Sequence, residues 1–169
     1  MWLSPKPFGE QVVKRMVELG MMVDASHRIP SARARVYDIV GKRAAILAFH
    51  VGAHEINPYP YNSKDWEMIQ IADSGGLIGV IFMNCWLMPR ESHRGLNFII
   101  HMIDHIVNVV GLDYVGIGSD SDGFTDPLDD LKGASQLPHL TQRLLAEGYS
   151  PVDIQKISGG NARHALMDD

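Results

Sequence analysis

Met21-Met22-Val23-Asp24-Ala25-Ser26-His27 is a short apolar run that ends on an imidazole. Two later stretches repeat this pattern: residues 45–50 are apolar up to His50, and residues 114–120 lead through a hydrophobic run to Asp120. In parallel α/β sheets and (β/α)₈ barrels, substrates bind over the carboxyl ends of the strands, so polar groups there are more often functional than elsewhere. The repetition predicts a barrel-type enzyme whose site residues follow its strands.

The segments before and between these predicted strands have apolar residues at helical spacing, which predicts amphipathic helices. Residues 8–19, just before Gly20, are an example. The strands themselves are unbroken in their hydrophobicity, which is typical of parallel strands covered on both faces. The sequence predicts strands over residues 21–24, 44–49, 77–83 and 114–118, and helices over 8–19, 31–40, 63–73, 95–110, 138–147, 151–157 and 161–167. Ser31 and Ser63 are the expected caps of their helices, and residues 50–63 and 84–94 are the expected long loops.

Four strands that alternate with helices correspond to half of a (β/α)₈ barrel, whose full form needs about 250 residues. We therefore predict an α/β fold, a single domain over residues 1–169 that forms a partial (β/α)₈ TIM-type barrel with extra C-terminal helices. A small doubly wound sheet is the alternative. It is less favoured because Gly116 and Gly118 lack the third glycine of a phosphate-binding loop.

The composition excludes several classes of protein. The chain is 46% hydrophobic and 21% charged, which suits one globular domain, and its net charge of -5 with scattered Lys and Arg argues against nucleic-acid binding. It has neither a signal-peptide core nor a lipid-anchor tail, and no apolar run of about 18 residues. Because Cys85 is the only cysteine, no internal disulfide can form. We expect a cytoplasmic protein without a membrane partner.

His27 and His50 follow consecutive parallel strands, which are usually neighbours in space, so the two imidazoles can meet at one metal ion. Either histidine alone is better explained by a hydrogen bond within the fold, and the pair makes the metal interpretation stronger. Asp120 is expected to face the same cavity. Asp24 is a third ligand, a partner that orients His27, or a cap of the following loop, with a supporting role favoured. Asp122 is expected to cap its turn.

Two other metal motifs fail on spacing. His101 and His105 are one helical turn apart, but Met102 occupies the position that a His-Glu-x-x-His protease gives to glutamate. We expect Asp104 and His105 on a helix surface or in packing of the helix against the barrel. The segment 120–122 resembles the start of a calcium loop, yet its twelfth position is Lys132 instead of a carboxylate.

Several motifs follow one another along nearly the whole chain: Pro7-Phe8-Gly9, residues 19–27, the strand that ends in His50, residues 75–80, Asp104-His105-Ile106, residues 115–123 and Gly159-Gly160-Asn161. In this order they resemble the membrane (renal) dipeptidase family, zinc hydrolases with a (β/α)₈ barrel. The resemblance implies that the chain is the carboxyl-terminal half of the barrel, beginning just before its fifth strand. It implies a dipeptide-like small-molecule substrate and amide hydrolysis.

For the site, the resemblance implies that His27 and His50 are the two histidine ligands of one ion in a dinuclear zinc centre. Asp120 would be the catalytic carboxylate near the scissile bond. The family's His-x-Asp pair and bridging glutamate have no counterpart, so this chain carries ligands for only one ion.

The expected substrate pocket includes Tyr61 and Asn84. Tyr61 stands where the family has an arginine that holds the substrate's carboxylate, which leaves substrate preference open. Trp86, directly after the third predicted strand, can also line the pocket.

A half-barrel exposes two sheet edges and apolar surface, so we expect a homo-oligomer or pairing with a separate amino-terminal half. The leading hypothesis is a dipeptidase-like metal-dependent hydrolase that is incomplete as this chain. The alternative is a non-catalytic half-barrel that dimerises or binds a partner.

Overall fold

The computed structural model describes residues 7–88, 95–123 and 126–167. Its centre is a four-stranded sheet in the order β1-β2-β3-β4, with every neighbouring pair parallel. The strands are β1 (Val23–Asp24), β2 (Ile46–Val51), β3 (Leu77–Val80) and β4 (Val115–Ile117). The sequence therefore predicted the number and order of the strands, and the α/β class is confirmed.

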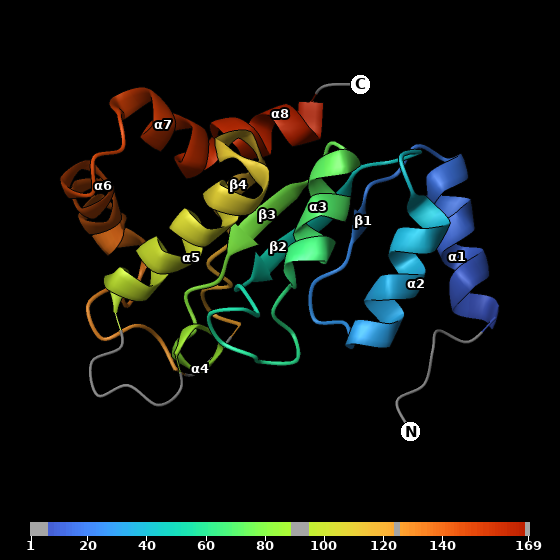
Figure 1. Ribbon diagram of the computed structural model, residues 1–169, viewed down its shortest axis with the longest axis horizontal. Coiled ribbons are helices and arrows are strands. Elements are labelled where there is room, and N and C mark those ends of the chain that lie inside the picture. The colour runs from blue at the N-terminus through green and yellow to red at the C-terminus, as the bar shows by residue number, and fades with distance from the viewer. Residues whose placement is uncertain (1–6, 89–94, 124–125, 168–169) are drawn as a thin grey trace.

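Helices connect the strands and cover them (Figure 1). The amino-terminal helices are α1 (Pro7–Glu18), α2 (Pro30–Val40), α3 (Asp65–Asp73), α4 (Asn84–Leu87) and α5 (Leu96–Val110). The carboxyl-terminal part contains η1 (Leu112–Tyr114), η2 (Ala134–Gln136), α6 (Leu137–Ala146), α7 (Pro151–Gln155), η3 (Lys156–Gly160) and α8 (Asn161–Met167). Helix α3 contacts β2 and β3, α5 contacts β3 and β4, and α8 contacts the ends of β3 and β4.

The strand order decides between the two predicted architectures. A doubly wound sheet reverses its strand order at a switch point, whereas a (β/α)₈ barrel adds each new strand beside the last one. The observed order is strictly sequential. The sheet therefore has the topology of a barrel segment, and the doubly wound alternative is wrong.

The core lies between the sheet and α5. Ile99, Met102, Ile103 and Ile106 project from one face of α5 at helical spacing and are each fully buried. All four residues of β3 are buried, as expected for an inner parallel strand. Burial of these side chains fixes the sheet against its helices. The residues that follow the strands are therefore held in fixed positions at the edge of the sheet.

Two glycines let the sheet curve tightly near its carboxyl end. A Cβ atom at Gly79 or at Gly118 would clash with the backbone carbonyl oxygen of Phe49. The register of β2 and β3 shifts between Ala48 and Val51, so β2 bulges at Phe49 and His50. The bulge and the two glycines together set where His50 leaves the strand.

Helix starts differ from the predicted ones. Helix α2 begins one residue early because Pro30 takes its first position, and no side chain caps it, so Ser31 is not the cap. Helix α3 begins after Lys64, whose backbone N–H donates to Glu67 Oε2 at 2.9 Å, so Ser63 is not the cap either. The predicted loop over 84–94 begins with helix α4, and its residues 89–94 lie outside the described part.

The long loop over residues 50–63 is held by a buried ion pair. Arg33 and Glu67 are each 1% exposed, and the guanidinium donates to both carboxylate oxygens at 2.7 and 2.9 Å. The same guanidinium also donates to the carbonyl oxygens of Arg28, Pro60 and Asn62, at 2.8, 3.1 and 3.1 Å. These five bonds satisfy the buried guanidinium and fix the loop against α2 and α3.

Among the described segments, none of the helices combines the length and the apolar character needed to cross a bilayer.

Candidate metal centre

His27 follows β1 and is placed by a tight turn. Asp24 Oδ1 accepts hydrogen bonds from the Ser26 backbone N–H at 3.0 Å and from the Ser26 hydroxyl at 2.7 Å. His27 itself adopts a left-handed backbone with φ of 55°, an uncommon conformation for a residue with a side chain. The Asp24 carboxylate thus caps the loop after β1, one of the roles considered for it, and the turn presents the His27 ring.

His50 lies at the end of β2 beside His27. Its backbone N–H donates to Ser26 Oγ at 3.3 Å, which joins the two strand ends directly. The imidazole rings of His27 and His50 have centroids 4.9 Å apart and are tilted by 57°. Two histidines separated by 23 positions in the sequence (50 − 27) therefore become neighbours, as their strand-end positions predict.

Asp120 reaches the same place from the loop after β4. It also has φ of 55°, and its carbonyl oxygen accepts a hydrogen bond from Gly123 N–H at 2.9 Å. One ligand atom each from His27, His50 and Asp120 all lie within 4.8 Å of one another. The three strand-end residues singled out in the sequence converge on one point.

The donor set suits a divalent transition metal. Two imidazole nitrogens and a carboxylate oxygen are ligands that Zn²⁺ accepts. His50 Nε2 is buried and, within the described residues, lacks a hydrogen-bond partner. A buried nitrogen without a partner is costly unless something binds it. His27, by contrast, is exposed, so the centre is open on one side.

Aromatic rings form one wall of this centre. Trp86, 2% exposed, has its ring centroid 5.0 Å from that of His27 and 6.3 Å from that of His50. The Tyr61 ring stacks on Trp86 at 5.5 Å and 14°, and Tyr59 lies 5.3 Å from Trp86. Side-chain amides hold this wall: Asn62 donates to the Trp86 carbonyl oxygen at 2.8 Å.

Of the remaining predicted residues, Tyr61 lies beside the three-residue group. Tyr61 has its ring centroid 5.7 Å from that of His27. Asn84 is buried in α4, where its amide donates to the Pro127 carbonyl oxygen at 2.6 Å and its Oδ1 has no partner in the described chain. Asp122 is exposed, with φ of 69°, and is not one of the clustered ligands.

Sequence reasoning missed how much Trp86 contributes, and it missed Ser26 altogether. Trp86 was considered only as a residue that could line the pocket, although its ring contacts both histidines. The one available signal was its position directly after a strand. Ser26 joins the ends of β1 and β2, a role that becomes visible only when both strands are in place.

A second group of metal-ligand types lies on the helical side of the sheet. His105 Nε2 and Asp65 Oδ1 are 2.7 Å apart, and a Glu55 carboxylate oxygen lies within 4.8 Å of both ligand atoms. The contact joins α5 to the start of α3, which agrees with the predicted helix-packing role of His105.

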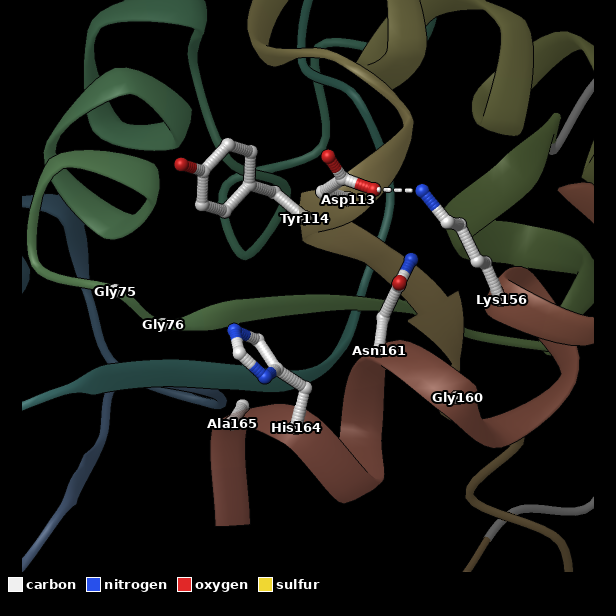
Figure 2. Close-up of a pocket in the computed structure, with 9 residues that line it drawn as sticks. All are labelled: Gly75, Gly76, Asp113, Tyr114, Lys156, Gly160, Asn161, His164 and Ala165. Atoms are coloured by element: carbon white, nitrogen blue, oxygen red, sulfur yellow. Dashed lines mark hydrogen bonds and ion pairs between the residues drawn. The ribbon is translucent and has the colours of Figure 1, made fainter. Parts of the chain in front are cut away.

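The opposite end of the sheet contains a cavity of about 530 Å³ (Figure 2). It lies at the amino ends of β3 and β4, and several of its polar side chains already have partners within the fold. Lys156 contacts Asp113 at 2.6 Å, and Asn161 donates to the carbonyl oxygens of Leu112 and Val115 at 2.7 and 2.8 Å. At this end of a barrel such contacts serve stability.

The chain matches the model of the membrane dipeptidase family, peptidase family M19, over residues 3–168. It is 35% identical over 164 residues to a protein of the pqqA 5′ region of Klebsiella pneumoniae, covering 95% of this chain and 59% of that protein. It is 29% identical over 168 residues to dipeptidase tcpJ of Claviceps purpurea, covering 98% of this chain and 38% of that protein.

Solved structures show the same relation. A dipeptidase of family M19 superposes with a TM-score of 0.88 at 27% identity, over 96% of this chain and 47% of the other. A metallopeptidase from Rhodobacter sphaeroides, bound to a phosphinate mimic of L-Ala-D-Ala, gives 0.88 at 28% identity, over 96% and 46%. The chain thus spans less than two thirds of the length of each of these proteins.

Proposed function

The chain belongs to the membrane dipeptidase family, and on that premise we propose that it forms the carboxyl-terminal half of a metal-dependent amide hydrolase acting on dipeptide-like substrates. Family membership supports the class of reaction and a metal-binding site. The identity of the metal as zinc, the roles of the individual residues and the activity of the complete protein belong to the proposal.

The observation that carries this proposal is the convergence of His27, His50 and Asp120, with ligand atoms within 4.8 Å of one another. The unpartnered, buried Nε2 of His50 adds to it, because a bound cation would satisfy that atom. His27 and His50 would hold the ion. Their donor types favour zinc over magnesium or calcium, which prefer oxygen ligands.

When bound, such an ion would lower the pKa of a coordinated water and polarise the substrate carbonyl. Asp120 would then act on protons: its carboxylate would accept one from the attacking water and deliver it to the leaving amine. Asp24 would keep the His27 turn in place through Ser26, and Asp122 would support the Asp120 loop. Tyr61 and Asn84 would contact the substrate.

Two histidines and one carboxylate are a small donor set for a complete zinc hydrolase centre. Zinc hydrolase sites use three protein ligands plus a water, and in this proposal Asp120 is occupied with proton transfer. A second polypeptide segment is therefore needed to complete the ligand set. We propose that an amino-terminal half of the barrel supplies it, either as a separate chain or as preceding sequence.

A partner-binding half-barrel without catalysis is the second candidate, and exposed apolar side chains favour it. Phe8 in α1, and Leu19 and Met21 between α1 and β1, are 75%, 58% and 48% exposed. Apolar surface beside an unpaired strand is a site of association. This candidate requires contact with another chain but no metal.

Zinc uptake separates the two candidates. We expect the purified chain to bind about one Zn²⁺ through His27 and His50, beside the Asp120 carboxylate. His27→Ala or His50→Ala should abolish tight binding, as measured by titration and elemental analysis. His139→Ala, at an exposed position in α6, is the matched control and should bind like the parent. Equal metal content in all variants would contradict the hydrolase proposal.

A further inference from the structure

A cavity of about 400 Å³ adjoins the candidate metal centre and is lined by Ile29, Pro30, Ser31, Pro60 and Tyr61. Apolar atoms dominate its lining, and none of these five residues carries a charge. The cavity is also close to the proposed chemistry. Ile29 is two positions after His27, and the Tyr61 ring, which forms a wall, has its centroid 5.7 Å from that of His27.

The two walls of this cavity come from segments that one buried group holds together. One wall consists of Ile29, Pro30 and Ser31, at the start of α2. The other wall consists of Pro60 and Tyr61, in the loop after β2. The Arg33 guanidinium donates to the Arg28 carbonyl oxygen on one side and to the Pro60 carbonyl oxygen on the other, at 2.8 and 3.1 Å.

Rigid elements keep the cavity open. Arg33 is itself fixed by its bidentate contact with buried Glu67. Two of the lining residues are prolines, whose backbone is restrained. Tyr61 is braced on its other side by stacking against Trp86. A cavity held in this way can receive a ligand group without reorganising.

We propose that this cavity is the specificity pocket of the hydrolase site, and that it takes an uncharged, apolar side chain of the substrate about the size of leucine. The proposal rests on the function proposed above, since the pocket gains its meaning from the adjacent centre. Its chemistry follows from the lining: aliphatic and aromatic surface favours apolar groups, and a charged side chain would lose its hydration there without finding a partner.

The test uses the metal-free 169-residue chain and two neutral probes, N-acetyl-leucinamide and N-acetylglycinamide. Their dissociation constants are measured by NMR titration. Burial of an isobutyl group predicts that the leucine amide binds at least about tenfold more tightly. Ile29→Asp, which places a charge in the lining, and Ser31→Trp, which fills the cavity, should each remove this preference.

Ile69→Asp is the matched control, because Ile69 is a 44% exposed isoleucine of α3 outside the cavity lining. It should keep the preference for the leucine amide. Circular dichroism of each variant establishes that it is folded. Equal affinities for the two amides would overturn the proposal that this cavity is a specificity pocket. An unchanged preference for the leucine amide in folded Ile29→Asp and Ser31→Trp would overturn it as well.

Zinc titration of the same proteins distinguishes this result from a failure of the proposed function. Ile29→Asp and Ser31→Trp should have zinc dissociation constants within about threefold of that of the parent, because neither substitution removes a group that holds the ion. Zinc binding without a preference for the leucine amide refutes only the pocket. A preference for the leucine amide without zinc binding refutes the hydrolase and leaves an apolar binding site.

Discussion

His27 and Asp120 adopt left-handed backbone conformations with φ of 55°, although neither is a glycine. Such conformations cost of the order of 1 kcal/mol each and persist where surrounding structure imposes them. Here the Asp24–Ser26 turn and the Asp120–Gly123 turn impose them. Backbone strain at both residues agrees with a site in which the direction of the His27 and Asp120 side chains matters more than local stability.

Gly123→Ala tests the placement of Asp120. A Cβ atom at Gly123 would clash with Asp120 Oδ1, and the carboxylate, being the end of a flexible side chain, would move. The negative charge of Asp120, within 4.8 Å of the histidine ligand atoms, stabilises a bound cation. We therefore expect zinc affinity to fall by about tenfold, or roughly 1.4 kcal/mol, when the carboxylate is displaced. The melting temperature should change little because the turn is exposed.

The matched control for this substitution is Gly133→Ala, since a Cβ atom at Gly133 meets nothing within 4 Å. Calorimetric titration with zinc measures both variants. If Gly123→Ala binds zinc as tightly as Gly133→Ala, Asp120 does not contribute to the centre.

At the scale of elements, the ends of β2, β3 and β4 depend on a close backbone approach. A Cβ atom at Gly118 would clash with the Phe49 carbonyl oxygen, and backbone cannot yield as a side chain can. We expect Gly118→Ala to lower the free energy of unfolding by about 3 kcal/mol, the upper range for overpacking. It should also weaken zinc binding, because His50 follows Phe49. Urea denaturation measures the first effect.

Gly116→Ala is the control for this strand. Its Cβ atom would lie 3.4 Å from side-chain atoms of Leu77, a contact that a small shift relieves. A loss of stability for Gly116→Ala as large as that for Gly118→Ala would show that β4 tolerates no glycine substitution at all, contradicting the specific role of the Phe49 contact.

The Arg33–Glu67 pair joins α2, α3 and the loop that carries Tyr61. Arg33→Met would leave the buried Glu67 carboxylate without its partner, and breaking a buried pair in this way costs about 3–5 kcal/mol. We expect a loss of stability in that range in urea denaturation. Arg15→Met, which removes a largely exposed partner of Glu18, should change stability by less than about 1 kcal/mol. Similar losses of stability in the two variants would show that the buried Arg33–Glu67 pair does not hold these elements together.

Elements with a strong local pattern were predictable from sequence, and long-range contacts were not. Helix α8 has its predicted bounds, and α5 differs by one residue at its start. The predicted caps were wrong because Ile29 and Lys64 occupy the N-cap positions, with Pro30 starting α2 and Glu67 bonding to the Lys64 backbone N–H. The proximity of His27, His50 and Asp120 was predictable because all three follow strand ends. The contacts of Trp86 were not, because they depend on a loop fixed by residues distant in sequence.

At the scale of the whole molecule, β1 and β4 are the edge strands of the sheet, and each has one unpaired side among the described residues. In the related M19 structures, this chain superposes on less than half of the length. We therefore expect the isolated chain to self-associate or to bind an amino-terminal half-barrel, as sedimentation velocity would show. Phe8→Glu should weaken this association, because it charges an apolar side chain of α1 that is 75% exposed.

Lys14→Glu, at an exposed position on the same helix, is the control for a change in charge alone. A chain that sediments as a stable monomer at all concentrations, and whose behaviour Phe8→Glu does not alter, would contradict the need for a partner.

The coordination of zinc in the loaded chain tests the central claim most directly. X-ray absorption spectroscopy should show imidazole scattering from two histidines, with zinc–nitrogen distances of about 2.0–2.1 Å. At the higher zinc concentration needed to load His27→Ala and His50→Ala, the signal should fall to one histidine. A spectrum without imidazole scattering, or one that both substitutions leave unchanged, would show that these strand ends do not form a metal centre.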